Sequence, residues 1–344
     1  MKVSTGNQRP SRTPRGVRRL AVLGAVLAVL VTGACGSGET AKPSGGEATS
    51  PGTASTGTPA ALAEDQYLEN AADFVDAANW DAAPKVRIEL GEMFFKPKDV
   101  TLEAGKPYVL ELVNTGAVTH EFVADQFFRS AATRKTESDS SEVKVPFFTE
   151  VEVFVGKTVE LFVIPVMPGV YELVCFITGH REAGMEGTIT VTGSAPAVPE
   201  PVLGDMAAGP WLQNGADLVE EASETWDAKA ETIRIEAGED GAAMFYEPKE
   251  PVLKVGTPYA LELVNVGRVV HEWVASEFFT TVAFRKAEDA EGEYKGPLPT
   301  EVEVFAGKQL DLYLIPTKAG TFEIFCEIPG HREAGMEGTI TVTE

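Results

Sequence analysis

Residues 171–192 read YELVCFITGHREAGMEGTITVT, and residues 322–343 read FEIFCEIPGHREAGMEGTITVT. The stretch GHREAGMEGTITVT is identical in both copies, which lie 151 residues apart. The same shift relates PYVLELVNTGAVTHEFVA (107–124) to PYALELVNVGRVVHEWVA (258–275). Repetition over this length indicates two tandem domains of about 130 residues each.

The repeats set the domain boundaries. We assign residues 62–192 to domain 1, residues 193–210 to a linker rich in Pro and Gly, and residues 211–344 to domain 2. Each domain opens with a helical pattern, at 62–80 and 211–226, and then turns to short β-rich runs. In domain 1 these runs are 86–90, 108–113, 151–155, 159–164, 170–175 and 188–191. Short strands without alternating helices predict an all-β sandwich or barrel in each domain, preceded by a short helix.

The N-terminus has the pattern of an export signal, which we assign to residues 1–34. A basic stretch precedes the apolar run Leu20–Val31, which is too short to span a bilayer comfortably. The small residues before Cys35 resemble a bacterial lipobox, so we expect Cys35 to carry a lipid. An ordinary cleaved signal with a free cysteine is the alternative. Residues 35–61, rich in Gly, Ser, Thr and Pro, then form a flexible tether.

The net charge of the sequence restricts the classes of partner that the protein can bind. The first 34 residues hold six bases and no acid, which leaves 23 bases against 52 acids and a net charge of −29 in the remainder. This balance argues against nucleic acid as a partner and favours a positively charged protein partner.

The histidines and the remaining cysteines occupy matching places in the two repeats. Each domain has one His between two strands and, roughly fifty residues later, a Cys-x4-His-x4-Met pattern. No histidine of the chain lies outside this arrangement. The residues are His120, Cys175, His180 and Met185 in domain 1, and His271, Cys326, His331 and Met336 in domain 2.

Chemistry accounts for the grouping of these side chains. Two imidazoles and one thiolate form a trigonal set, and a thioether adds a weak, long axial contact, which is the ligand set of a blue-copper electron-transfer site. The sequence therefore predicts two copper ions, one per domain. Four histidines are too few for the many-histidine copper clusters of a large oxidase.

Several features together resemble the cupredoxin family, of the plastocyanin and sulfocyanin type. They are the Cys-His-Met loop, the Asn-x-Gly stretch before the first His (114–116 and 265–267), and the MFFKP or MFYEP strand. The resemblance implies two Greek-key β-sandwiches with copper near one end, held by the eight residues named above. The segments 125–148 and 276–299 are longer than a minimal cupredoxin needs, and we interpret them as a lid or docking loop.

Some of these residues have alternative interpretations. A disulfide would have to join Cys175 to Cys326 between domains and would leave the His and Met pattern unexplained. Met185 and Met336 are the least secure ligands, because Met is a common core residue.

We expect Met93 and Met244 to be strand core residues. We expect Phe94, Phe122, Phe245 and Trp273 to lie in the core. We expect four acids near the proposed ligands to be exposed to solvent: Glu182, Glu186, Glu333 and Glu337. Arg181 and Arg332 are candidates to form ion pairs with them.

Three functions compete on this basis. The leading hypothesis is a non-enzymatic electron carrier, tethered by lipid to the outer side of a bacterial cytoplasmic membrane, with a redox partner such as a c-type cytochrome. The second is a copper protein for tolerance, storage or delivery, without obligatory electron transfer. The third, a multicopper enzyme, needs additional histidines for a catalytic copper, and this chain has none to spare.

Overall fold

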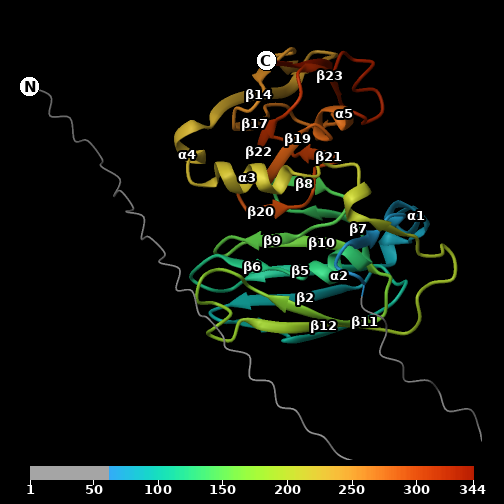
Figure 1. Ribbon diagram of the computed structural model, residues 1–344. Coiled ribbons are helices and arrows are strands. Elements are labelled where there is room, and N and C mark those ends of the chain that lie inside the picture. Colours follow the sequence, from blue (N-terminus) through green and yellow to red (C-terminus); the bar gives the residue numbers. More distant parts are fainter. Residues whose placement is uncertain (1–61) are drawn as a thin grey trace, which may run out of the picture. The chain divides into compact units, whose positions relative to one another are not determined.

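The structure is a computed structural model, which describes residues 62–344 (Figure 1). The predicted signal peptide, the lipidation of Cys35 and the tether lie outside the described residues. Within residues 62–344, no helix is both long enough and apolar enough to cross a membrane.

Short strands dominate both repeats, as the sequence predicts. Domain 1 contains β1 (Gln66–Leu68), α1 (Ala71–Ala77), a 3-10 turn (Trp80–Ala82), β2 (Lys85–Gly91), β3 (Phe94–Lys96), β4 (Asp99–Glu103), β5 (Tyr108–Asn114), β6 (His120–Phe122), α2 (Asp125–Ser130), β7 (Ala131–Glu137), β8 (Ser141–Lys144), β9 (Glu150–Val153), β10 (Thr158–Pro165), β11 (Gly169–Val174) and β12 (Glu186–Thr192).

The linker holds β13 (Leu203–Asp205) and a 3-10 turn (Met206–Ala208). The second repeat opens with two helices and then follows the order that domain 1 has from β2 onward. It contains α3 (Gly215–Ser223), α4 (Trp226–Lys229), β14 (Glu231–Asp240), β15 (Ala243–Glu247), β16 (Val252–Lys254), β17 (Tyr259–Asn265), β18 (His271–Trp273), α5 (Ser276–Phe279), β19 (Val282–Glu288), β20 (Gly292–Lys295), β21 (Glu301–Val304), β22 (Gln309–Pro316), β23 (Gly320–Phe325) and β24 (Glu337–Thr343).

Each repeat is a β-sandwich. In domain 1 the strands β3, β2, β5, β10, β7 and β8 lie side by side, and β11, β12 and β4 form a second sheet. Strand β10 alternates buried and partly exposed residues, as expected for a strand with one face toward a core. The apolar faces meet in a core that includes Ile88, Leu112 and Leu161, all fully buried. The predicted all-β sandwich is therefore confirmed.

The two repeats share their sheets, which the sequence did not predict. Strand β9 of domain 1 pairs with β20 of domain 2, and strand β21 of domain 2 pairs with β8 of domain 1. Each pairing extends a sheet of one repeat into the other, so that two eight-stranded sheets cross the domain boundary. Figure 1 shows the green strands β8 and β9 beside the orange-red strands β20 and β21. The core is continuous across this boundary as well.

The long segments 125–148 and 276–299 build this shared region. Each forms a short helix and a hairpin, α2–β7–β8 and α5–β19–β20, and the outer strand of each hairpin pairs with the opposite repeat. The prediction of a lid is wrong, because these backbones are committed to sheet hydrogen bonds. Their docking partner is the other half of the chain. Pairing of this kind covers strand edges that would otherwise be open to aggregation.

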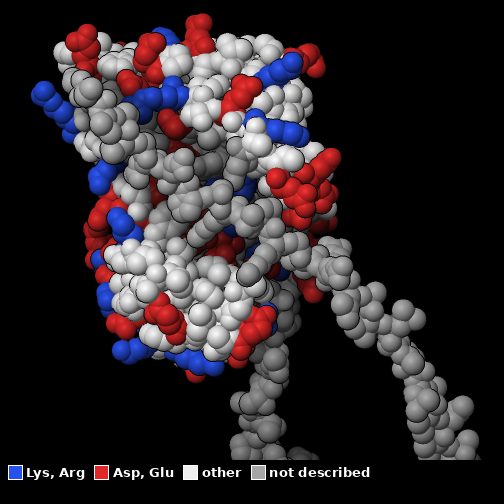
Figure 2. Space-filling view, turned by 90° about the vertical axis from the view of Figure 1, so that its left-hand side faces the viewer, with Lys and Arg blue, Asp and Glu red and all other residues white. Residues whose placement is uncertain are grey.

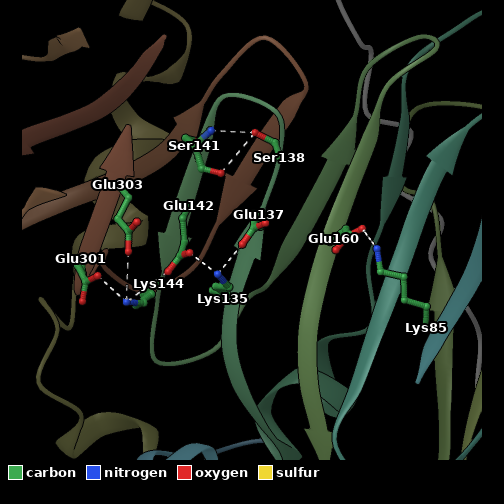
Figure 3. A network of polar contacts seen from close by, with 10 residues as sticks. All are labelled: Lys85, Lys135, Glu137, Ser138, Ser141, Glu142, Lys144, Glu160, Glu301 and Glu303. Carbon is green, nitrogen blue, oxygen red and sulfur yellow. Dashed lines mark hydrogen bonds and ion pairs between the residues drawn. The ribbon is translucent and has the colours of Figure 1, made fainter. Parts of the chain in front are cut away.

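Carboxylates line up across the shared sheets. Glu142 on β8 lies opposite Glu303 on β21, and Lys144 lies opposite Glu301. The Lys144 ammonium is 2.5 Å from a Glu301 oxygen and 3.3 Å from a Glu142 oxygen, between the two strands in Figure 3. Burial, and then the charge of Glu142, raise the pKa of Glu303 to about 8. In the other shared sheet, burial and Glu293 raise the pKa of Glu152 to about 7.

Some local predictions fail. The helix expected over 62–80 is confined to Ala71–Ala77, and β1 before it pairs with β13 inside the predicted linker. Phe94, expected in the core, is exposed, whereas Phe122 and Trp273 are buried as predicted. Met93 lies in the turn between β2 and β3 with a positive φ of 64°, so it is no strand residue. Met244 does lie on a strand and packs against the core, and Phe245 is half-buried on the same strand.

Candidate metal centres

The loop between β11 and β12 carries three of the predicted ligands of domain 1. Cys175 directly follows β11, and its backbone N–H donates to the carbonyl of Met185 at 3.2 Å. The N–H of Met185 donates in turn to the carbonyl of His180 at 3.0 Å. These bonds close the loop on itself, so its side chains are held by the backbone without help from a ligand.

The fourth predicted ligand arrives from a neighbouring strand. His120 begins β6, which is joined to β11 by the backbone pairing of Val123 with Val174. Donor atoms of His120, Cys175 and His180 all lie within 4.8 Å of one another. The Cys175 sulfur is 3.3 Å from Nδ1 of His180, and the two imidazole centroids are 5.1 Å apart. The predicted His-Cys-His set is thus brought together in domain 1.

Domain 2 repeats this geometry closely. His271, Cys326 and His331 also offer donor atoms within 4.8 Å of one another. The Cys326 sulfur is 3.4 Å from Nδ1 of His331, and the imidazole centroids are 5.2 Å apart. The structure therefore contains the same arrangement once in each repeat.

A backbone donor approaches each cysteine sulfur. The N–H of Glu121, next to His120, lies 3.4 Å from the sulfur of Cys175, and the N–H of Glu272 lies 3.4 Å from the sulfur of Cys326. The side chain of Glu121 is itself fixed, because it accepts the N–H of Phe176 at 2.9 Å. Hydrogen bonds to the thiolate sulfur are among the features that tune a copper–thiolate site.

Burial keeps the donors in their uncharged forms. It raises the pKa of the Cys175 thiol and raises the pKa of Cys326 to about 11. It also lowers the pKa values of His120, His271 and His331. Neutral imidazoles are ready to bind a metal, whereas each thiol has to release its proton when a metal binds.

The candidate donor atoms fit copper in two respects: their chemical type, and the lack of other hydrogen-bond partners for the first histidine. Both ring nitrogens of His120 are buried without a hydrogen-bond partner among the described residues, and so are those of His271. Buried polar atoms without partners are rare and point to a missing ligand or ion. Soft thiolate together with imidazole is the donor set that selects copper.

The remaining predicted residues have simpler positions. Met185 and Met336 are fully buried beside the cysteines, and their role as axial ligands stays a prediction. Cys175 and Cys326 are free, so the alternative of a disulfide between them is not realised. Arg181 pairs with Glu172, and Arg332 pairs with Glu323 and Glu337. The acids Glu182, Glu186, Glu333 and Glu337 are exposed, as predicted.

Two residues in each repeat support the loop before the first histidine: an Asn, which the sequence analysis noted only as part of the Asn-x-Gly stretch, and a Glu, which it did not identify. The Asn114 amide donates to the carbonyls of Val118 and Val153, both at 2.8 Å, and so joins the loop before His120 to β9. Asn265 does the same in domain 2. Glu92 and Glu239 contact the loops that precede the first histidines. The signal for this Glu pair was present, because the two residues match under the 147-residue shift that holds upstream of the insertion.

Comparison with known proteins agrees with this geometry. A cupredoxin-like domain family matches residues 70–191, and the plastocyanin/azurin family of copper-binding proteins matches residues 233–343. The copper-resistant cuproprotein CopI of Rubrivivax gelatinosus is 33% identical over 116 residues, which cover 33% of this chain and 68% of CopI.

The solved structures that match this chain are more distant. The copper-containing nitrite reductase of Thermus scotoductus is 13% identical with a TM-score of 0.29, over 76% of this chain and 62% of that chain. A multicopper oxidase of Campylobacter jejuni is 12% identical with a TM-score of 0.29, and the match covers 77% of this chain and 65% of the oxidase. The chain thus spans less than two-thirds of either protein, and similarity at this level does not extend to activity.

The fold and the paired centres define a protein of two tandem copper-binding domains. The chain belongs to the cupredoxin family and is related to the copper-resistance protein CopI.

Proposed function

We propose that this protein is an electron carrier that holds one mononuclear copper ion in each domain. The single observation that carries the proposal is the duplicated His-Cys-His cluster, whose donor atoms lie within 4.8 Å of one another in both repeats. In this proposal the trigonal ligands are His120, Cys175, His180 and His271, Cys326, His331, and the axial ligands are Met185 and Met336.

Rigidity of the ligands supports electron transfer. Backbone hydrogen bonds close the Cys-His-Met loop, and a cross-strand pairing fixes the strand of the first His. When bound, copper supplies a one-electron couple. The chain's own contribution is to keep the donor atoms in nearly one arrangement for both oxidation states, which lowers the reorganisation that each transfer needs.

The surface beside the first centre supports a contact with a redox partner. His180 lies closer to solvent than the fully buried His120. Phe176, directly after Cys175, is 58% exposed, and Val118, two residues before His120, is also exposed. Exposed apolar side chains next to a buried centre are typical of an interaction surface. The matching positions in domain 2 are Glu327 and Val269, so the two centres present different surfaces to a partner.

Charge favours a basic partner, and we propose a c-type cytochrome. The face drawn in Figure 2 carries clusters of acidic side chains with basic ones dispersed among them. Such a surface steers a positively charged protein, with an association rate that falls as salt rises. We further propose that a lipid on Cys35 anchors the protein outside the cytoplasmic membrane, with residues 35–61 as the tether.

A non-enzymatic role is part of this proposal. A catalytic copper needs a coordination position open to substrate and protein ligands of its own. All four histidines of the chain are taken by the two proposed centres.

Copper tolerance, storage or delivery is the second candidate, favoured by the relationship to CopI. The ligands would be the same, and the difference lies in how firmly copper is held. The deciding experiment loads the full chain with copper and measures two properties. Reversible one-electron cycling by voltammetry, with Cu(I) retained against a chelator, supports the electron carrier. Rapid loss of Cu(I) to the chelator supports the tolerance or delivery role.

A further inference from the structure

A carboxylate faces the first histidine ring of domain 2. An oxygen of Glu239, near the end of β14, lies 3.2 Å from Nε2 of the fully buried His271. At this distance the carboxylate is a direct electrostatic partner of the ring nitrogen. The carboxylate therefore stands beside the ring nitrogen that would otherwise be without a polar neighbour.

The same carboxylate is fixed by the loop that leads to His271. Glu239 accepts the backbone N–H of Arg268 at 3.0 Å and that of Val269 at 3.2 Å. One side chain therefore contacts both the ring and the backbone two and three residues before it. This double contact ties the position of the ring to the end of β14.

A glycine makes room for the carboxylate. A Cβ at Gly267 would stand 2.5 Å from a Glu239 oxygen, so any other residue here would displace the carboxylate from its present position. In domain 1 a Cβ at Gly116 would stand 2.8 Å from an oxygen of Glu92 and 2.8 Å from Nε2 of His120. The glycine of the Asn-x-Gly stretch is thus explained by the close approach of a carboxylate in both repeats.

Domain 1 has the equivalent glutamate and glycine, but without the ion-pair contact between the carboxylate and the histidine ring. Glu92 accepts the N–H of Ala117 in the loop before His120, as Glu239 does with Arg268 in domain 2. The two acids occupy equivalent places at the ends of β2 and β14. The ion-pair contact with the ring, however, is a feature of Glu239 and His271.

An imidazole has two nitrogens, and a partner on one leaves the other for a metal. The sulfur of Cys326 and Nδ1 of His331 lie on the cluster side of the site. We propose that Glu239 is a positioning residue, which engages Nε2 of His271 and directs Nδ1 toward the copper. The inference rests on the proposed copper coordination by His271.

Two consequences follow from a carboxylate behind a metal-binding imidazole. It limits rotation of the ring, and its negative charge makes the ring a stronger donor, which favours Cu(II) over Cu(I). Loss of such a partner typically weakens metal affinity by about 10- to 100-fold. A tenfold change in the ratio of Cu(II) to Cu(I) affinity corresponds to about 59 mV for a one-electron couple.

The test compares Glu239→Gln with its parent in the full chain carrying Cys175→Ser, so that only the centre of domain 2 loads copper. Gln keeps the shape and an oxygen for the loop N–H groups, but it removes the charge. We expect the thiolate absorption to persist, Cu(II) affinity to fall about tenfold or more, and the reduction potential to rise by about 59 mV per tenfold change.

Two further variants separate positioning from general effects. Glu333→Gln removes an exposed charge two residues from His331 and should leave the potential nearly unchanged. Gly267→Ala should displace the Glu239 carboxylate and reproduce the Glu239→Gln shift. Unaltered affinity and potential in Glu239→Gln, or an equal shift in Glu333→Gln, would overturn the inference. A parent protein that binds copper without thiolate absorption would instead refute the coordination proposed for His271 and Cys326.

Discussion

The hydroxyl of Ser141 donates a hydrogen bond of 2.6 Å to a carboxylate oxygen of Asp289, and this contact joins the two repeats. Ser141 begins β8 of domain 1, and Asp289 follows β19 of domain 2. The same carboxylate accepts the hydroxyls of Ser138 and Tyr294 and the backbone N–H of Gly292. A buried charge is tolerated here because nearly every lone pair of the carboxylate has a donor.

This contact lies between the two metal centres. On one side, Ser141 pairs with Val304, which pairs with His271. On the other side, Gly292 pairs with Val153, which pairs with His120. Each first histidine is therefore two strand pairings away from the Asp289 cluster. The strands that position the centres also hold the repeats together.

Removal of the Asp289 carboxylate should destabilise the whole molecule. Asp289→Ala leaves the buried hydroxyls of Ser141 and Tyr294, and the half-buried hydroxyl of Ser138, without their acceptor, at a cost of about 2–4 kcal/mol in the free energy of unfolding. Asp289→Asn should cost less, because an amide oxygen still accepts. Denaturant unfolding of the metal-free protein measures both variants, with the exposed Asp81→Ala as control. A loss below about 0.5 kcal/mol in Asp289→Ala would contradict this account.

Separation of the repeats should expose reactive strand edges. A fragment of residues 62–192 loses the partners of β8 and β9, and a fragment of residues 211–344 loses those of β20 and β21. Open edges with alternating apolar residues pair with other chains. We expect each fragment alone to associate or aggregate, and the mixed fragments to form a one-to-one complex. Size-exclusion chromatography with light scattering measures this, and stable monomeric fragments would disprove the role of the shared sheets.

Glu303 should make stability depend on pH. Its pKa of about 8 in the folded protein is above the usual 4.5 of a glutamate, so the folded state keeps a proton that the unfolded state releases. The contribution of Glu303 to the free energy of unfolding is therefore fully present below pH 4.5 and is lost as the pH rises to about 8. The charged residues around it are Glu142, Glu272, Glu301 and Lys144.

Glu303→Gln should remove this dependence. Relative to wild type, its free energy of unfolding should be about equal at pH 5 and higher by on the order of 1–2 kcal/mol at pH 8, after allowance for solvent screening. Thermal or denaturant unfolding across this pH range gives the difference. The exposed Glu250→Gln serves as a control with a constant difference. A gap between Glu303→Gln and wild type that does not widen with pH would show that Glu303 is already ionised in the fold.

The proposed role of the methionines as axial ligands can be tested without removing the other ligands of the centres. Met185→Leu keeps the volume of a fully buried side chain, so folding should change by less than about 1.5 kcal/mol. Copper should remain bound by the three strong ligands, while loss of the thioether favours Cu(I) and raises the reduction potential of that centre, by about 59 mV for each tenfold change in the affinity ratio. Met167→Leu, half-buried near the start of β11, is the control. If the two variants have the same potential, Met185 is only a core residue.

The local part of this architecture was predictable. The alternation of apolar residues around Val86, Ile88 and Leu90 predicted β2, and the repeated first His together with the Cys-x4-His spacing predicted the His-Cys-His composition of both clusters. Such patterns are local, and duplication within one chain displays them twice. The residues of each cluster were therefore predictable from the sequence alone.

The connection between the repeats could not be predicted in the same way. The hairpins β7–β8 and β19–β20 have ordinary strand patterns, and nothing in Ser141 or Gly292 specifies which distant strand each will meet. Pairing between edges depends on the three-dimensional placement of both domains. The role of Glu239 was hidden for a related reason, since its contact with His271 arises only when β14 and β17 lie side by side.

The central claim is one Cys–His copper centre per domain, and copper titration of the full chain monitored by visible absorption tests it most directly. The account predicts two coppers per chain with an intense thiolate-to-copper band, about half of that band in Cys175→Ser and in Cys326→Ser, and none in the double variant. Full colour in either single variant, or copper bound without this band, would contradict it.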